Sequence, residues 1–364
     1  MEERLLAEKL IGYDTSHPDG IRLCAGFVKG WMEAREINTS EMEIRGLPVL
    51  VAEVGPKDGP SIVLHGHIDV VPAREGQFEP RVEGDRLIGR GAYDMKGAAA
   101  AMMLAVNDLA AQKDVRVVLA IVPDEEAEDE DYRGTDMLVD NGLAADFAIT
   151  GEPTDMHVGI AAKGVLAVRV EVSGRAAHGS TPWEGDNAIL KAFSVFRGIE
   201  SLPFSRESSE LFDRPSINLG RILGGDALNK VPDTCVIDVD IRYLPEQDEG
   251  EILAQIETLP DSHVLSTFRR PPVEVDRESA FVVALCAATQ EHHGGDVAGV
   301  GRDGASDAIS FIRVGVPAVE FGPSGAGHHG PDEWVSLSSL AAYRRALCNF
   351  AGRVPAALAA EAGR

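Results

Sequence analysis

Continuous apolar strands that alternate with helical segments constrain the fold of this chain more than any other feature of its sequence. The run Val115-Arg-Val-Val-Leu-Ala-Ile-Val122 has no polar face, which is typical of a strand covered by helices on both sides. Further strands are expected at about 48–54, 61–65, 146–150, 296–301 and 316–321, and helices at about 2–13, 21–35, 97–111, 135–141, 279–292, 306–313 and 337–351. This rhythm predicts an α/β fold built around a buried sheet.

The middle third of the chain follows a different pattern. Strands expected at 165–173, 216–223 and 235–243 alternate apolar and polar residues, as half-exposed antiparallel strands do, and helical periodicity marks 186–199 and 246–257. The α/β rhythm then resumes after Pro271-Pro272. The sequence therefore predicts an α/β domain made of 1–160 and 273–364, with a smaller α+β domain inserted at 161–272.

Charge and composition exclude several classes of partner. The formal net charge of -25 would repel nucleic acid and anionic membranes, so neither is expected as a partner. No apolar run approaches the roughly 20 residues of a membrane helix, and the start lacks a secretion signal, so a cytoplasmic location is expected. The 4 cysteines are scattered, so any metal must use nitrogen and oxygen ligands.

An imidazole and a carboxylate stand two residues apart where one of the expected strands ends, in Leu64-His-Gly-His-Ile-Asp-Val-Val-Pro72. A histidine that binds zinc through one ring nitrogen needs an acceptor for the N–H of the other, and a carboxylate two positions along can provide it. We interpret His67 as a metal ligand and Asp69 as its orienting partner. The alternative is a strand-end histidine satisfied by a neighbouring side chain.

Four further loops place acidic or imidazole side chains just beyond strand ends, where open α/β sheets bind ligands. They are Gly89–Gly97 with Asp94, Asp124-Glu125-Glu126, Gly151-Glu152-Pro153-Thr154, and Gly327–Glu333 with His328 and His329. Each has an ordinary alternative: a helix-capping Asp94, a solvated acidic loop that continues through 127–131, or exposed loop histidines. Together the loops supply a set of carboxylates and imidazoles that suits zinc, cobalt or manganese in a two-metal site with the ions about 3.5–4 Å apart.

In this order and spacing, the five motifs resemble those of the acetylornithine deacetylase / succinyl-diaminopimelate desuccinylase / aminoacylase / glutamate carboxypeptidase family of di-zinc metallohydrolases. The resemblance implies a zinc-exopeptidase-like mixed-sheet catalytic domain carrying an inserted, ferredoxin-like dimerisation lid. It also implies two zinc ions, with cobalt or manganese as alternatives. In this scheme His67 and Glu152 bind one ion, Glu126 and His329 bind the other, and Asp94 bridges both.

The same resemblance assigns the remaining roles. Glu125 takes the position of the general base, and His65 has no family role and is expected in the core or behind the ligands. His329 is preferred over His328 because it stands two residues before Pro331-Asp-Glu333.

The inserted domain matches through Gly174–Pro182, Gly185–Ala188 and Asn229–Pro232. In relatives this lid forms a homodimer, and the histidine at the position of His178 reaches the partner chain's active site to stabilise the oxyanion. Asn229 and Arg242 correspond to residues that bind the substrate carboxylate. A surface charge at a strand edge is the alternative for Arg242.

The implied function is a metal-dependent amidohydrolase that removes the acyl group from a small N-acyl amino acid, of the succinyl-diaminopimelate desuccinylase or acetylornithine deacetylase type. A zinc-bridging hydroxide would attack the amide, with Glu125 accepting its proton. One departure matters: well-known desuccinylases carry paired arginines before the lid strand, whereas this chain reads Ala161-Ala162-Lys163-Gly164. A metallo-exopeptidase of the glutamate carboxypeptidase or dipeptidase type is the alternative, and a non-catalytic paralogue is a third hypothesis.

Overall fold

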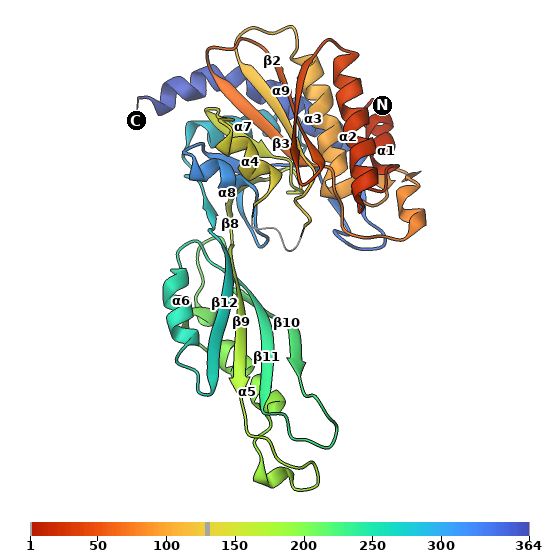
Figure 1. The fold of residues 1–364 in the computed structure, drawn as a ribbon. Helices are drawn as coiled ribbons and strands as arrows, with labels where there is room; N and C mark the ends of the chain where they lie inside the picture. The colour runs from red at the N-terminus through yellow and green to blue at the C-terminus, as the bar shows by residue number, and fades with distance from the viewer. Residues whose placement is uncertain (1, 128–131, 364) are drawn as a thin grey trace. The chain divides into compact units, whose positions relative to one another are not determined.

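The computed structural model describes residues 2–127 and 132–363, which divide into two compact units (Figure 1). The first unit consists of Met1–Ile160, Val275–Val300 and Asp307–Arg364. The second consists of Ala161–Glu274 together with the short segment Gly301–Ser306. Of the acidic loop expected at 127–131, residues 128–131 lie outside the described part of the chain.

A mixed sheet, most of whose strands belong to the first unit, has nine strands in the described residues. Eight of them follow the order β1-β2-β6-β3-β7-β15-β8-β13, and β14 pairs with β8. Strands β6, β3, β7 and β15 run parallel, and the strands at both ends of the sheet pair antiparallel. The strands are β1 (Asn38–Ile44), β2 (Leu47–Val54), β3 (Ser61–His67), β6 (Arg116–Val122), β7 (Phe147–Thr150), β8 (Val158–Ala162), β13 (Val273–Glu274), β14 (Gly299–Arg302) and β15 (Ala318–Glu320). The mixed α/β class predicted from the sequence is confirmed.

Helices cover both faces of this sheet, and the alternation along β3 shows how. Gly66 faces Met95 and Met102 beside α3, whereas the ring of the preceding His65 packs edge-on against Phe311 of α8. The central strands are apolar on both faces for this reason. The helices of the first unit are α1 (Glu2–Ile11), α2 (Pro18–Glu33), α3 (Gly97–Asp108), α4 (Gly134–Asp140), α7 (Ala280–Gln290), α8 (Ala308–Arg313) and α9 (Leu337–Glu361).

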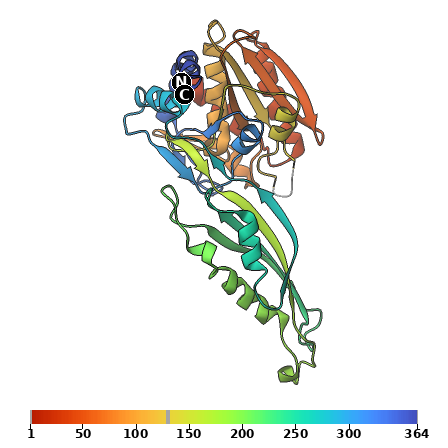
Figure 2. The ribbon, with the colours of Figure 1, turned by 90° about the vertical axis from the view of Figure 1, so that its left-hand side faces the viewer.

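The second unit has the ferredoxin-like β-α-β-β-α-β order. Its elements are β9 (Gly164–Ser173), α5 (Ala188–Ile199), β10 (Ser216–Gly224), β11 (Thr234–Tyr243), α6 (Glu249–Ile256) and β12 (Ser262–Arg270). The strands form an antiparallel sheet in the order β10-β11-β9-β12, and both helices pack on the same side of it (Figure 2). Alternate residues of β11, such as Ile237 and Val239, point into the core beneath these helices.

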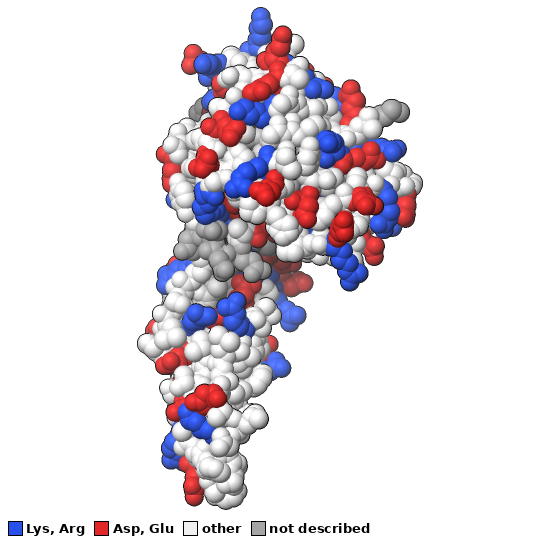
Figure 3. Space-filling view, turned by 45° about the vertical axis from the view of Figure 1, so that its right-hand side comes forward, with Lys and Arg blue, Asp and Glu red and all other residues white. Residues whose placement is uncertain are grey.

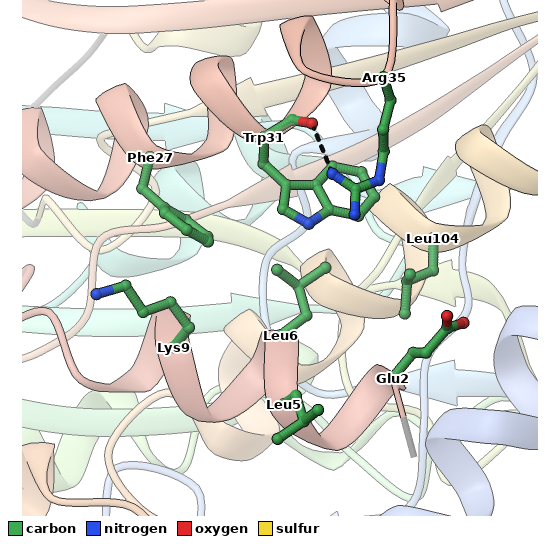
Figure 4. A pocket seen from close by; sticks show the side chains of 8 residues that line it. All are labelled: Glu2, Leu5, Leu6, Lys9, Phe27, Trp31, Arg35 and Leu104. Atoms are coloured by element: carbon green, nitrogen blue, oxygen red, sulfur yellow. Dashed lines mark hydrogen bonds between the residues drawn. The ribbon is translucent and has the colours of Figure 1, made fainter.

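A surface hollow of about 340 Å³ lies between α1, α2 and α3 (Figure 4). Its lining consists of Glu2, Leu5, Leu6, Lys9, Phe27, Trp31, Arg35 and Leu104. The guanidinium of Arg35 stacks on the ring of Trp31, 3.6 Å from the ring centroid. None of these lining residues belongs to the five motifs singled out in the sequence, so the hollow lies apart from the expected chemistry.

Charged side chains of both signs are interspersed over the face drawn in Figure 3. Among the described residues, no helix combines the length and the apolar character needed to cross a membrane.

Candidate metal centre

The strand order brings three of the five motifs to one edge of the sheet. Strand β3 ends at His67, and its parallel neighbours β6 and β7 are followed by Glu125-Glu126 and Glu152 respectively. The carboxyl ends of parallel strands meet at the same edge, which explains why residues far apart in the chain converge here. The turn at Asp94 before α3 and the loop with His329 complete the group. We call the set His67, Asp94, Glu126, Glu152 and His329 the candidate metal centre.

The first ligand group consists of His67, Asp94 and Glu152. The Nε2 atom of His67 lies 3.1 Å from Oδ1 of Asp94 and 3.8 Å from Oε1 of Glu152. One donor atom from each of the three residues lies within 4.8 Å of the others. This is the set that the family resemblance implies for one metal ion.

The second group consists of His329, Glu126 and Asp94. The Nε2 atom of His329 lies 3.0 Å from Oε1 of Glu126 and 3.3 Å from Oδ2 of Asp94. Asp94 therefore turns one oxygen toward His67 and the other toward His329, as a bridging carboxylate would. His328 also reaches this oxygen, with its Nε2 only 2.6 Å from Oδ2 of Asp94, so the structure brings both adjacent histidines to the site.

Asp69 contacts His67 through its backbone carbonyl as well as through the carboxylate that the sequence suggested. The Nδ1 atom of His67 lies 3.1 Å from the backbone carbonyl oxygen of Asp69 and 3.4 Å from its carboxylate Oδ1. A carbonyl can only accept, so Nδ1 carries the hydrogen and Nε2 faces Asp94. The other carboxylate oxygen, Oδ2, accepts a 2.8 Å hydrogen bond from the backbone N–H of Glu126. Asp69 thus links the ring of His67 to the backbone of Glu126.

The burial and charge of these donors are compatible with a divalent cation. Burial and the nearby charge of Asp94 raise the pKa of Glu152 well above its usual range. Hydrogen bonds to Asp94 and Glu126 raise the pKa of His329 to about 10. Burial opposes protonation of His67, yet its hydrogen bonds to Asp69 and Asp94 raise its pKa well above the usual range. The raised pKa values of these groups reflect several carboxylates held close together, where bound positive charge is favourable. A mixed set of oxygen and imidazole donors suits zinc, cobalt or manganese.

Glu125 lies beside this set and differs from its neighbour in its contacts. Its Oε1 accepts a 2.7 Å hydrogen bond from Nη1 of Arg133, and burial raises its pKa to about 7 against the opposing charge of Arg133. A carboxyl group that titrates near neutrality suits a general base.

Several residues of this region were not predicted. Glu333 binds the backbone N–H groups of Tyr93 and Asp94 at 2.9 and 3.1 Å, and Arg90 binds Glu333. Arg133 and Asp307 pair beneath Glu125. The position of Arg90 between two glycines of the Asp94 motif was a usable signal, whereas no motif marks Arg133 or Asp307.

The three predicted residues of the inserted domain lie in the second unit. The exposed ring of His178 contacts Oγ of Ser180 at 2.7 Å, and the N–H of Gly179 donates to the carbonyl of Asn229 at 2.7 Å, so His178 and Asn229 are neighbours. Arg242 lies on β11, where its Nε donates to Asp240 at 3.0 Å.

Lys163 lies in the second unit as well. Its ammonium group is 2.7 Å from Oδ1 of Asp303 and donates to the carbonyl of Arg214, also at 2.7 Å. The ammonium group of Lys163, which stands where well-known desuccinylases carry paired arginines, is thus engaged within the chain.

Residues 63–353 match the family model described as peptidase family M20/M25/M40, and this span includes all five motifs. The chain belongs to this family. The family resemblance inferred from the motifs is therefore confirmed. As a member of this family, the protein is a hydrolase of amide bonds that binds divalent metal.

Named relatives and solved structures agree with this assignment. The protein is 29% identical over 304 residues to the succinyl-diaminopimelate desuccinylase of Erythrobacter litoralis, and the alignment covers 79% of each chain. It is 29% identical over 333 residues to the enzyme of the same name from Caulobacter sp., covering 85% of each. A metallo-carboxypeptidase from Sulfolobus solfataricus has the same fold, with a TM-score of 0.81 at 19% identity over 98% of this chain and 100% of that one.

Proposed function

We propose that the protein removes the acyl group from a small N-acyl amino acid and that succinyl-diaminopimelate is its leading substrate. The names of its relatives support this substrate, because the desuccinylases cover about four fifths of the chain. The observation that carries the chemistry is the placement of Asp94, whose two oxygens face His67 and His329 respectively.

Two zinc ions are the proposed cofactors, with cobalt or manganese as alternatives. His67 and Glu152 would hold one ion, Glu126 and His329 the other, and Asp94 both. When bound, the ions would supply Lewis acidity that polarises the scissile carbonyl and acidifies water.

The side chains of the protein would perform the proton transfers and hold the substrate. Glu125 would accept a proton from the attacking water and return it to the leaving amine. His178 of the partner subunit would donate to the developing oxyanion. Asn229 and Arg242 would bind the carboxylate of the amino-acid part.

A homodimer through the second unit is part of this proposal. Leu190 and Phe193 stand one turn apart on α5 with 65% and 50% of their surface exposed, and Leu223 on the edge strand β10 is 54% exposed. Apolar side chains beside an unpaired strand edge favour pairing with a second copy of the chain.

The contacts of Lys163 favour one alternative. The ammonium group of Lys163 already contacts Asp303 and the carbonyl of Arg214. Binding a succinyl carboxylate at this lysine would therefore require these contacts to be exchanged. A metallo-exopeptidase that cleaves small peptides needs no such contact and is the second candidate.

Hydrolysis of a substrate panel by the zinc-loaded protein tests the proposal. The panel contains succinyl-diaminopimelate, N-acetylornithine and a set of dipeptides, with release of free amine as the readout. Preference for an acylated amino acid is expected. Preference for dipeptides would favour the exopeptidase, and no turnover at full zinc occupancy would leave the non-catalytic paralogue.

A further inference from the structure

Glu125 is held by a buried chain of hydrogen bonds that the proposed chemistry does not yet use. Nη1 of Arg133 donates to Oε1 of Glu125 at 2.7 Å and to Oδ1 of Asp307 at 3.1 Å. The side chain of Asp307 is fully buried and that of Arg133 is 15% exposed. A single guanidinium nitrogen therefore joins the two carboxylates.

The far side of Asp307 is fixed as well. The hydroxyl of Thr135 donates to Oδ2 of Asp307 at 2.6 Å. Since the hydroxyl hydrogen points to Asp307, the hydroxyl oxygen accepts the 2.8 Å hydrogen bond from the Nε2–H of His65. The direction of each hydrogen bond from His65 to Glu125 follows from these contacts, and His65 lies on β3 only two residues before His67.

We propose that Arg133 is a positioning residue for Glu125 and that Asp307, Thr135 and His65 hold its guanidinium in place. The inference rests on the proposed function, in which Glu125 is the general base. Among the described contacts, Arg133 engages Oε1 of Glu125, and the proton would go to Oε2. One oxygen each of Glu125 and Glu126 and a ring nitrogen of His67 lie within 4.8 Å of one another. A base must be held within a fraction of an ångström of its productive position, which a flexible glutamate on a loop does not achieve alone.

A structural explanation competes with this proposal. Arg133 could serve only to neutralise the buried Asp307, in which case Glu125 would be an incidental neighbour. Two variants separate these explanations: Arg133→Met removes the guanidinium, and Arg133→Met with Asp307→Asn removes both charges, so that no buried carboxylate at residue 307 is left unpaired. Arg133→Lys keeps a cation that can reach both partners.

The chain offers a matched control in Arg45. Its Nη2 lies 2.5 Å from Oδ2 of Asp124, the residue before Glu125, and its Nη1 donates to the carbonyl of Tyr132. Arg45→Met therefore removes an arginine–carboxylate pair from the same loop without touching Glu125.

Steady-state kinetics and metal content test the proposal on the zinc-loaded protein. The Arg133→Met variant and the Arg133→Met/Asp307→Asn double variant should both lose kcat by roughly ten- to a hundredfold, with KM within about twofold and the metal-to-protein ratio unchanged. Arg133→Lys should recover part of kcat, and Arg45→Met should keep it. Adding Glu125→Gln to Arg133→Met should slow the enzyme no further than Glu125→Gln alone.

Three results would overturn the role of Arg133: full kcat in the charge-balanced double variant, an equal loss in Arg45→Met, or a loss of kcat that follows the loss of metal. These outcomes are distinct from failure of the proposed function, which would show as absence of turnover by the unaltered protein across the substrate panel.

Discussion

Arg90 and Glu333 form a buried ion pair, with Nη1 of Arg90 2.6 Å from Oε2 of Glu333 and side-chain exposures of 4% and 1%. Each partner also binds the backbone of a ligand loop. Arg90 donates to the carbonyl of His329 at 2.9 Å, and Glu333 accepts from the N–H of Asp94 at 3.1 Å. The pair therefore ties together the backbone at Asp94 and at His329, whose side chains meet at the candidate metal centre.

Replacing Arg90 with Met should destabilise the protein by about 3–5 kcal/mol, because Glu333 would stay buried without its cation. Urea unfolding of the metal-free protein measures this change. Arg81→Met is the control: its pairs with Glu83 and Asp332 are exposed and should contribute less than about 1 kcal/mol. Equal effects of the two substitutions would contradict the role of the buried pair.

The adjacent acids Glu125 and Glu126 should respond differently to the same substitution. Glu125→Gln should keep both metals and lose turnover, since the amide preserves the shape of the side chain without its basicity. Glu126→Gln should lose metal, because Glu126 and His329, which lie 3.0 Å apart, are the proposed ligands of the same ion and an amide is a weaker ligand than a carboxylate. Elemental analysis after gel filtration distinguishes them, and matching metal loss in both variants would refute the division of roles.

The proposed contribution of His178 across a dimer can be tested by mixing two inactive variants. His178→Ala and Glu125→Gln should each be nearly inactive, since loss of one oxyanion donor typically costs on the order of a hundredfold or more. A mixed dimer combines an intact Glu125 with an intact His178 of the partner subunit, so co-refolded protein should be more active than either parent. If activity stays at the parental level although mixed dimers form, His178 does not act across the interface.

Complete burial should make His65 a source of acid sensitivity. Burial lowers the pKa of His65 to about 4 from the ordinary 6.5, so the unfolded chain takes up the proton first as the pH falls. The stability that neutral His65 contributes is therefore present above about pH 6.5 and lost toward pH 4. The difference in unfolding free energy between the metal-free protein and its His65→Gln variant should shrink over that interval, and a constant difference would be inconsistent with a buried neutral imidazole.

The parts of the fold that could be predicted are those with one dominant physical signal. The strands β3 and β6 are apolar on both faces, and α3 is a run of small buried residues, so periodicity located them within a few positions. Strands β1 and β12 were among those missed. β1 reads Asn-Thr-Ser-Glu-Met-Glu-Ile and β12 is largely exposed, so edge strands of this kind carry little hydrophobic pattern.

The last helix, α9, shows a different limit of sequence reasoning. It was expected to end near residue 351 but extends to Glu361 with Pro355 inside it. Val354 and Ala357 on either side of that proline are buried, so packing against the first unit outweighs the cost of the proline.

For the candidate metal centre, the motifs predicted which residues converge. They did not predict the hydrogen bonds and ion pairs that hold those residues in place. Arg133 and Asp307 stand 174 positions apart, and only the folded chain brings them together. The orientation of His67 by a backbone carbonyl is likewise a property of geometry that side-chain identities do not encode.

Gly66 and Gly151 directly precede His67 and Glu152 of the candidate metal centre, and both are packed against methionine side chains. A β-carbon would lie 2.6 Å from Cε of Met95 at Gly66 and 2.5 Å from the same atom at Gly151. An alanine at either position would force the methyl end of the Met95 side chain, which both glycines face, to move away. One methionine side chain thus packs against the segments before both His67 and Glu152, so a change of volume at either glycine would be felt at the other through Met95.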